Sequence, residues 1–558
     1  MKLETFFEKF DQFADAPDAV VKMRELVLQL AVTGKLVEPN TKDSPASALL
    51  ASVATQRASL VTERKIKTRP SSPVTADEQP FELPPSWEWA RLSDVGYELG
   101  QKIPDSRFTY IDVGSIDSDK GRISDRVEQL EPNDAPSRAR KLVERGTVIY
   151  STVRPYLLNI AIVEQVFSPK PIASTAFGIL HPFAGINNRY LYYWLRSAPF
   201  TAYVQEGMKG MAYPAINDEK FYGGFIAVPP SAEQKRIVAK VDELMALCDR
   251  LEAQQQERET RHAALARASL ARFADAPTPA NLAFLFHPSY AIPPADLRKS
   301  ILTLAVQGKL VPQDPNDEPA EELIARLERD LPRLAKQQGV RSPKNIPPLA
   351  AENYPHDIPE SWQWSRIGNL ALVIDYGTSQ KSHSDSSKIP VYRMGNIVGG
   401  RLLDENLKYV DAGIDDLPGL YLKTDDILFN RTNSYELVGK TGIFTGRNDT
   451  ATFASYLIRI RLPSTLLFPT FYSVAMNAQY FRQTQIEPEV VQQCGQANFN
   501  GTKLSSTVVP VPPLAEQRRI VAKVEQLMAL VDKLETQLTE SRAIAGKLME
   551  AVVAELTT

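Results

Sequence analysis

Two polar stretches, one in each half of the chain, carry side chains suited to contacts with nucleic acid. In residues 146–163 a β-branched run leads into Ser151, Thr152, Arg154 and Tyr156 before apolar residues resume. In residues 425–444 the corresponding place holds Asn430, Arg431, Thr432, Asn433 and Ser434. Arginine can bond guanine and asparagine can bond adenine through paired hydrogen bonds, while hydroxyl groups hold phosphates. Both stretches predict a strand, a polar loop that suits a DNA groove and a second strand, and the alternative is an ordinary turn.

Further polar, glycine-bearing loops lie near the beginning and the end of the same two regions. Their candidate contact residues are Gln101, Lys102, Lys209 and Tyr213 in the first region and Gly377, Thr378, Ser379, Gln496 and Asn498 in the second. We expect these loops to reach the face that carries the two central polar stretches.

Motifs of common catalytic sites are missing from the sequence. It has no GxxxxGK[ST] phosphate loop, no HExxH, no GxSxG and no cluster of Cys and His with zinc spacing. The Asn/Asp-Pro-Pro-Tyr/Phe motif of amino-methyltransferases is also missing, and Asp425 and Asp426 read as solvated or turn residues. We therefore predict that the chain is not an enzyme on its own and has no catalytic or metal-binding residues.

The elements that must position these loops occur twice. Residues 229–241 read PPSAEQKRIVAKV and residues 512–524 read PPLAEQRRIVAKV. Proline suits a helix start because it lacks the N–H that the first turn leaves unpaired. Apolar residues then alternate at spacings of four and three, which predicts two long helices with a coiled-coil seam. The seam comprises Ile237, Val241, Leu244, Cys248 and Leu251 in the first copy and Ile520, Val524, Leu527, Val531 and Leu534 in the second, continuing through Leu548 and Val552.

Each long helix has a shorter repeated element upstream. Residues 24–37 read RELVLQLAVTGKLV and residues 298–311 read RKSILTLAVQGKLV. Gly34 and Gly308 are well placed as left-handed residues that end a helix, so each copy predicts a short helix with a defined stop. The polar linkers that follow, 61–80 and 336–355, lack periodicity and are expected to be extended or mobile.

The next repeated element contains alternating tryptophans. The matched residues are Trp87 and Trp89 in the first half and Trp362 and Trp364 in the second. This pattern predicts the entry of a strand with one tryptophan in a core.

The β-rich regions enclosed by the repeats resemble each other much less than the repeats do. A repeated frame with divergent inserts indicates one task performed twice and two different targets, whereas the alternative is an old duplication that drifted. The predicted parts are 1–86, a helix and linker; 87–229, the first β-rich domain; 230–275, the central long helix; 276–361, a second helix and linker; 362–511, the second β-rich domain; and 512–558, the distal long helix.

The amino-acid composition limits the classes of protein to which this chain can belong. With 43% hydrophobic and 23% charged residues and no apolar run of signal-peptide or membrane-spanning length, the chain reads as globular, with the cytoplasm as its expected compartment. A net charge of −3 does not by itself indicate a nucleic-acid binder, so a local basic face or a partner has to supply positive charge. Cys248 and Cys494 favour buried thiols over a disulfide or a metal site.

The doubled helix start, the doubled LAVxGKLV element and the stretch DDILFNRTNSYELVGKTGIF together resemble the specificity (S) subunits of type I restriction-modification enzymes. The resemblance implies two target-recognition domains that each read half of an asymmetric double-stranded DNA site, and long helices that pack as an antiparallel coiled coil. It also implies partners: two methyltransferase (M) subunits with S-adenosylmethionine for adenine methylation, and restriction (R) subunits with ATP and Mg. This chain itself would bind no cofactor.

The predicted fold is α+β, with two tandem pseudo-symmetric halves that each join a mixed β-rich domain to a long helix. Two alternatives to a restriction complex stay open: a coiled-coil scaffold whose inserts bind proteins, and an S-like subunit of a methylation-only system. Salt dependence discriminates the first alternative, because DNA binding weakens steeply with ionic strength.

Overall fold

The computed structural model describes residues 16, 18–125, 127–208, 214–287, 290–341, 346–347, 350, 354–493 and 496–557. These residues divide into two compact units. Unit 1 comprises Met1–Glu257 and Ser541–Thr558, and unit 2 comprises Arg258–Glu540. Each unit combines helices with mixed sheets, so the predicted α+β class and the predicted division into two halves are confirmed.

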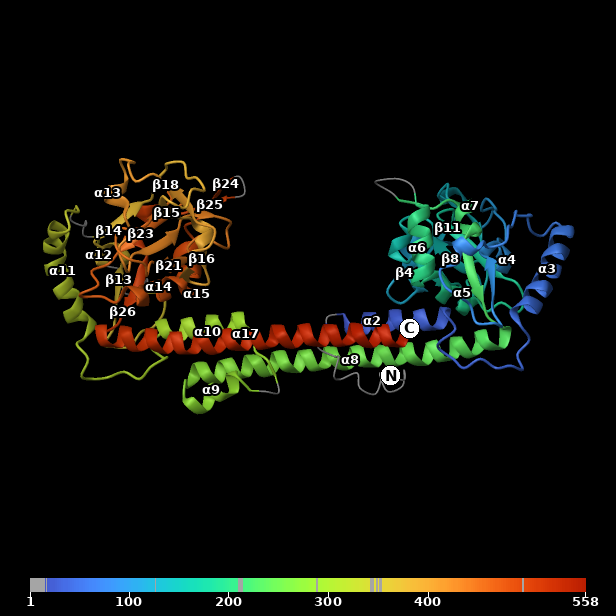
Figure 1. Ribbon diagram of the computed structural model, residues 1–558, viewed down its shortest axis with the longest axis horizontal. Coiled ribbons are helices and arrows are strands. Elements are labelled where there is room, and N and C mark those ends of the chain that lie inside the picture. Colours follow the sequence, from blue (N-terminus) through green and yellow to red (C-terminus); the bar gives the residue numbers. More distant parts are fainter. Residues whose placement is uncertain are drawn as a thin grey trace. The chain divides into compact units, whose positions relative to one another are not determined.

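Two long helices contribute a segment to both units (Figure 1). Helix α8 (Ser231–Asp275) begins after Pro229-Pro230 and α17 (Leu514–Thr557) begins after Pro512-Pro513, as the doubled motif predicted. The start of α8 shares an apolar cluster with the end of α17 in unit 1. In unit 2 the start of α17 shares one with the end of α8. The two helices therefore run antiparallel.

The predicted seam residues have a common environment. Ile237, Val241, Leu244 and Cys248 in α8, and Ile520, Val524, Leu527 and Val531 in α17, are buried, while Leu251 and Leu534 are partly buried. Burial raises the pKa of the Cys248 thiol to about 11. Near the end of α17 the prediction is wrong at one position: Leu548 is 45% exposed, and the buried residues are Ala545, Met549 and Val552.

The short repeated helices complete the helical frame of each unit. Helix α2 (Ala19–Val32) packs on α8 in unit 1, and α10 (Pro294–Val306) packs on α17 in unit 2 (Figure 1). Gly34 and Gly308, just beyond the two helix ends, have φ of +76° and +69°, as predicted for left-handed residues. The long helices are thus buried by a third helix as well as by each other.

Helices α3 (Ala46–Thr62) in unit 1 and α11 (Ala320–Gln337) in unit 2 were not predicted from the sequence. The remaining helices of the frame and its flanks are α4 (Leu92–Val95), α9 (Pro279–Leu285) and α12 (Ile367–Leu370). Within the described residues no helix is long and apolar enough to cross a membrane.

The β-rich domain of unit 1 contains two four-stranded sheets. One has the order β2-β11-β8-β9 and the other β6-β3-β10-β7, beside the pairs β1-β12 and β4-β5. The strands are β1 (Glu88–Arg91), β2 (Gly96–Tyr97), β3 (Phe108–Ile111), β4 (Ile116–Asp117), β5 (Arg122–Ile123), β6 (Glu128–Leu130), β7 (Ala139–Leu142), β8 (Val148–Ser151), β9 (Ile160–Ile162), β10 (Pro171–Ser174), β11 (Phe177–Pro182) and β12 (Phe225–Val228). Its helices are α5 (Asn188–Leu195), α6 (Ala198–Gly207) and α7 (Asp218–Gly223).

The domain of unit 2 repeats this arrangement. The sheet β14-β23-β19-β21 corresponds to β2-β11-β8-β9, and β13-β26 corresponds to β1-β12; the other sheets are β18-β15-β22, β16-β17 and β20-β25-β24. The strands are β13 (Gln363–Arg366), β14 (Val373–Tyr376), β15 (Ile389–Tyr392), β16 (Ile397–Val398), β17 (Arg401–Leu402), β18 (Lys408–Val410), β19 (Ile427–Asn430), β20 (Thr432–Asn433), β21 (Thr441–Ile443), β22 (Thr452–Phe453), β23 (Leu457–Arg461), β24 (Val491–Gln493), β25 (Gln496–Asn498) and β26 (Val508–Val511). Its helices are α13 (Leu417–Leu420), α14 (Pro469–Asn477), α15 (Gln479–Phe481) and α16 (Gly501–Ser506).

One tryptophan of each predicted pair fastens the β-rich domain to the long helix. Trp87 is 4% exposed and donates its indole N–H to Glu233 Oε1 at 3.1 Å, in the first turn of α8. Trp362 is 2% exposed and donates to Glu516 Oε2 at 2.9 Å, in the first turn of α17. The prediction of a strand entry with a core tryptophan is confirmed in both units.

Candidate nucleic-acid interface

The two polar stretches occupy equivalent places in the two domains. In unit 2, β19 runs into Arg431, whose carbonyl accepts a hydrogen bond from Phe499 N at 2.9 Å. In unit 1, β8 runs into Thr152, whose carbonyl accepts from Ile216 N at 3.0 Å. In both units the next residue forms an antiparallel β-pairing with a second backbone segment. Thr432 pairs with Asn498, and Val153 pairs with Ala215. One backbone scaffold therefore presents different side chains in each unit.

A polar cluster gathers on this scaffold in unit 2. The Arg431 guanidinium lies 4.8 Å from the centroid of the Tyr376 ring and donates to Ser455 O and to Asn498 Oδ1, both at 3.3 Å. Thr432 Oγ1 donates to the same Asn498 oxygen at 2.8 Å. The fold thus brings together Arg431, Thr432 and Asn498 from predicted loops far apart in sequence. Tyr376, which the sequence reasoning missed, is 43% exposed beside them.

The other predicted residues of unit 2 have mixed surroundings. Asn430 is 2% exposed, and its Oδ1 lacks a hydrogen-bond partner within the described residues. Gly377 lies so close to β22 that a Cβ would meet Phe453 O at 2.2 Å, so this glycine serves backbone packing. Thr378 is buried and donates to Asp416 Oδ2 at 3.1 Å. Ser379 is exposed, and Asn433 Oδ1 accepts from Ser434 N at 2.8 Å.

Unit 1 has a smaller exposed set. Ser151 and Thr152 are 1% and 7% exposed, and their hydroxyl groups donate to Val153 O and Ala176 O, both at 2.8 Å. Both hydroxyl groups are therefore used within the fold, and their contact with DNA stays a prediction. Arg154 is exposed in a left-handed conformation with φ of +48°, and Tyr156 is 44% exposed.

The remaining candidates are Gln101, Lys102, Lys209, Tyr213 and Gln496. Gln101 and Lys102 are exposed. The backbone of Gln101 forms an isolated antiparallel β-bridge with that of Lys141. Lys102 Nζ lies 2.7 Å from Asp105 Oδ1. Lys209 and Tyr213 lie outside the described residues. Gln496 belongs to β25, but its side chain is outside the described part.

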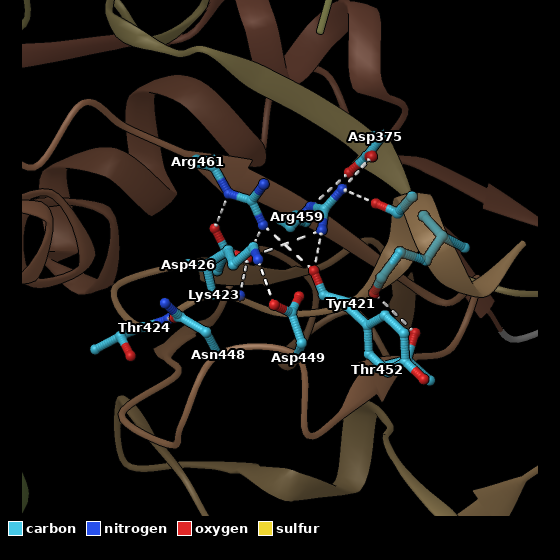
Figure 2. A network of polar contacts seen from close by, with 12 residues as sticks. Asp375, Tyr421, Lys423, Thr424, Asp426, Asn448, Asp449, Thr452, Arg459 and Arg461 are labelled. Carbon is cyan, nitrogen blue, oxygen red and sulfur yellow. Dashed lines mark hydrogen bonds and ion pairs between the residues drawn. The ribbon is translucent and has the colours of Figure 1, made fainter. Parts of the chain in front are cut away.

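A buried ionic network supports the strand that carries Tyr376 (Figure 2). Arg459, which is 2% exposed, donates to both carboxylate oxygens of Asp375 and to Tyr421 O. Arg461 makes a bidentate contact with fully buried Asp426, at 2.7 and 2.6 Å. Burial raises the pKa of Asp375, although Arg459 opposes that shift. Asp426 is therefore not solvated, although it does close a turn with Lys423, whose N–H donates to Asp426 Oδ2 at 2.8 Å.

Unit 1 has a comparable support, also missed from the sequence. Lys141 is 2% exposed and its Nζ lies 3.1 Å from Glu98 and 3.2 Å from Asp218. Glu98 in turn accepts from Arg69, whose guanidinium lies 3.8 Å from the Tyr222 ring centroid. The charge of Lys141 is therefore used inside the domain.

The fold and the two loop clusters define a class of protein: two variants of one recognition domain carried on a duplicated helical frame. The described residues contain no group of three or more His, Cys, Asp or Glu that could hold a metal ion. The two loop clusters therefore offer hydrogen-bond donors and acceptors on an exposed protein surface.

Comparisons with known proteins agree with this class. Residues 359–541 match the family described as the type I restriction modification DNA specificity domain. The chain is 29% identical over 543 residues to the EcoAI specificity subunit of Escherichia coli, covering 92% of this chain and 90% of that one. It is 27% identical over 560 residues to the EcoEI specificity subunit of Escherichia coli, with 96% and 93% covered. A chain of a solved type I R-M system aligns over 86% of this chain and 99% of its own, with 24% identity and a TM-score of 0.47.

The chain is therefore a relative of the specificity subunits of type I restriction-modification enzymes, as its repeated motifs predicted. Specificity subunits are the non-catalytic components of these enzymes. The prediction that the chain is not an enzyme on its own is confirmed by this relationship.

Proposed function

We propose that the two β-rich domains, residues 87–229 and 362–511, each read one half of an asymmetric DNA site split by unspecified bases. The observation that carries this proposal is the shared backbone scaffold: Thr432 pairs with Asn498 in unit 2 where Val153 pairs with Ala215 in unit 1. A scaffold kept constant while its side chains differ suits two domains that bind one kind of polymer at different sequences.

The unit 2 cluster supplies the chemistry that base reading requires. Arg431, Asn498 and Tyr376 combine a cation, an amide and an exposed aromatic ring on adjoining backbone segments. In unit 1 the loop exposes Arg154 and Tyr156, which can contact phosphates or bases. Proteins that bind in the major groove use donors and acceptors of this kind at base edges.

The frame would set the distance between the half-sites and dock the enzymatic subunits. Helices α8 and α17 contain 45 and 44 residues, which corresponds to roughly 66 Å each at 1.5 Å per residue. Deletion of one heptad from both helices is expected to shorten the unspecified spacer and leave both half-sites unchanged. Altered half-sites would contradict the role of the helices as a ruler.

Duplicated ion pairs support two equivalent docking surfaces. Arg24 contacts Asp249 and Glu252 in unit 1, each at 2.7 Å. Arg298 contacts Asp532 and Glu535 in unit 2, at 2.6 and 2.7 Å. Equivalent surfaces suit two copies of one partner, here two M subunits that bring S-adenosylmethionine for adenine N6 methylation. R subunits, with ATP and Mg, would join for cleavage, and this chain would bind no cofactor.

A salt titration separates the proposal from a protein-binding scaffold. The chain in complex with its methyltransferase should lose DNA affinity steeply between 50 and 200 mM salt, by about tenfold or more if several phosphates are contacted. An affinity that hardly changes with salt, or a complex that captures a protein and no duplex, would favour the scaffold.

A further inference from the structure

Asn498 lies on the exposed face of β25 with its side-chain amide held in one orientation. Its Oδ1 accepts from Arg431 Nη2 at 3.3 Å and from Thr432 Oγ1 at 2.8 Å. A guanidinium group can only donate hydrogen bonds, so the amide oxygen must face Arg431. The amide NH2 group therefore points the other way, and it has no hydrogen-bond partner among the described residues.

Arg431 is itself fixed, which makes the orientation of the amide firm. Its guanidinium stacks near the Tyr376 ring at 4.8 Å and donates to Ser455 O at 3.3 Å. The Tyr376 hydroxyl in turn accepts from Gly501 N at 2.7 Å. A flipped amide would direct its NH2 group at the guanidinium and lose the hydrogen bond from Arg431, so the cluster disfavours the flip.

The equivalent backbone positions of unit 1 cannot form this clamp. They hold Thr152, Val153 and Ala215 in place of Arg431, Thr432 and Asn498. Ala215 has no side-chain amide, and Val153 has no hydroxyl to donate. At these described positions the oriented amide is thus found in the second domain and not in the first, as expected for a group that distinguishes one half-site from the other.

We propose that Asn498 is a fixed hydrogen-bond donor of the second recognition domain. It would read an acceptor atom of DNA, and at a base edge this means guanine O6 or N7, thymine O4 or adenine N7. It would not bond adenine through paired hydrogen bonds, because its own oxygen is already occupied. Arg431 and Thr432 are then positioning residues for this amide. The inference rests on the proposed function.

The test compares the full chain with its Asn498→Asp and Asn498→Ala variants, each co-expressed with the methyltransferase partner, by mapping methylated motifs and measuring duplex binding. Asn498→Asp keeps an oxygen for Arg431 and Thr432 but replaces the donor with an acceptor. At one base pair of the second half-site, preference for the wild-type base should fall about fivefold or more. The first half-site should stay unchanged.

A second variant guards against a folding defect at Asn498. Thr432→Val leaves the amide in place but removes one of its two hydrogen bonds, so it should relax preference at the same base pair and nowhere else. A variant that only destabilised the domain would lower methylation without moving that preference.

The outcomes distinguish a base edge from a phosphate as the source of the acceptor atom. They also distinguish failure of this inference from failure of the proposed function. Uniform weakening at every sequence, larger for Asp than for Ala, supports a donor that faces a phosphate oxygen. Unchanged motifs and affinities in both Asn498 variants would overturn the inference. The inference would also be overturned if the affected base were an adenine and the wild-type chain needed the 6-amino group of that adenine to recognise it. A wild-type chain that installs no split motif would instead contradict the proposed function, and this inference with it.

Discussion

Trp362 donates its indole N–H to Glu516 Oε2 at 2.9 Å, and this one hydrogen bond ties the entry of the second β-rich domain to the first turn of α17. Trp87 and Glu233 make the same contact in unit 1 at 3.1 Å. Glu516 also accepts from Gln313 Nε2 at 2.6 Å, so its carboxylate joins the linker, the domain and the helix. The recognition domain is therefore anchored at the point where the frame begins.

Glu516→Ala should destabilise unit 2 by about 1 to 3 kcal/mol, because it leaves the buried indole N–H of Trp362 without its partner. Glu516→Gln keeps an oxygen that can accept from Trp362 and should cost much less. The free energy of unfolding from urea titrations measures both. Equal stability of the Ala variant and the wild type would show that the contact does not anchor the domain.

The same carboxyl group predicts a pH dependence. Burial raises the pKa of Glu516 and of Glu233 above the ordinary glutamate value. A carboxyl group whose pKa is raised by folding contributes most stability below its unfolded pKa and loses that contribution as pH rises through the folded pKa. The Glu516→Gln variant lacks this ionisation, so its stability relative to the wild type should rise from pH 4.5 towards neutral pH. A stability difference that stays constant over this range would contradict the shift.

Gly308→Ala tests the end of α10. At φ of +69° an alanine Cβ would be strained and would lie 2.3 Å from Pro359 Cγ, so we expect a loss of about 2 kcal/mol or more. Gly339 is a matched control, because it has the same φ of +69° and nothing within 4 Å of the added Cβ. Gly339→Ala should cost only about 1 kcal/mol. Equal losses would mean that the close approach to Pro359 is unimportant.

Arg431→Ala should weaken binding of the second half-site by about 1 to 3 kcal/mol if the residue reads or positions a base contact, and should relax specificity there. Weakening that is equal for all duplexes would identify a phosphate contact. Binding measured on duplexes that differ in one half-site at a time distinguishes these results. Unchanged affinity for every duplex would remove Arg431 from the interface.

The repeated frame was predictable because its signals are local. The Pro-Pro pairs, Gly34 and Gly308 act within a few residues of their own positions, so the sequence alone placed both long helices and the ends of α2 and α10. Helix α11 carried a readable signal as well, in the spacing of Leu323, Leu327 and Leu331, but Pro332 lies inside this helix, where a proline argues against helical structure.

The candidate interface was predictable only in part, because its geometry depends on distant pairings. Asn498 meets Arg431 across 67 positions of sequence, and Asp426 is buried by Arg461 across 35. Residue type alone identified Arg431 and Asn498 as candidates, but it could not foresee that one orients the other. It also could not show that the hydroxyl groups of Ser151 and Thr152 are used inside the loop.

We propose that this chain gives sequence specificity to a methyltransferase through two different recognition domains. The most direct test is a genome-wide map of N6-methyladenine in cells that express the methyltransferase with and without this chain. We predict a split, asymmetric motif that appears only when the chain is present. A soluble complex that installs no new motif, or a motif that is already present without the chain, would contradict the claim.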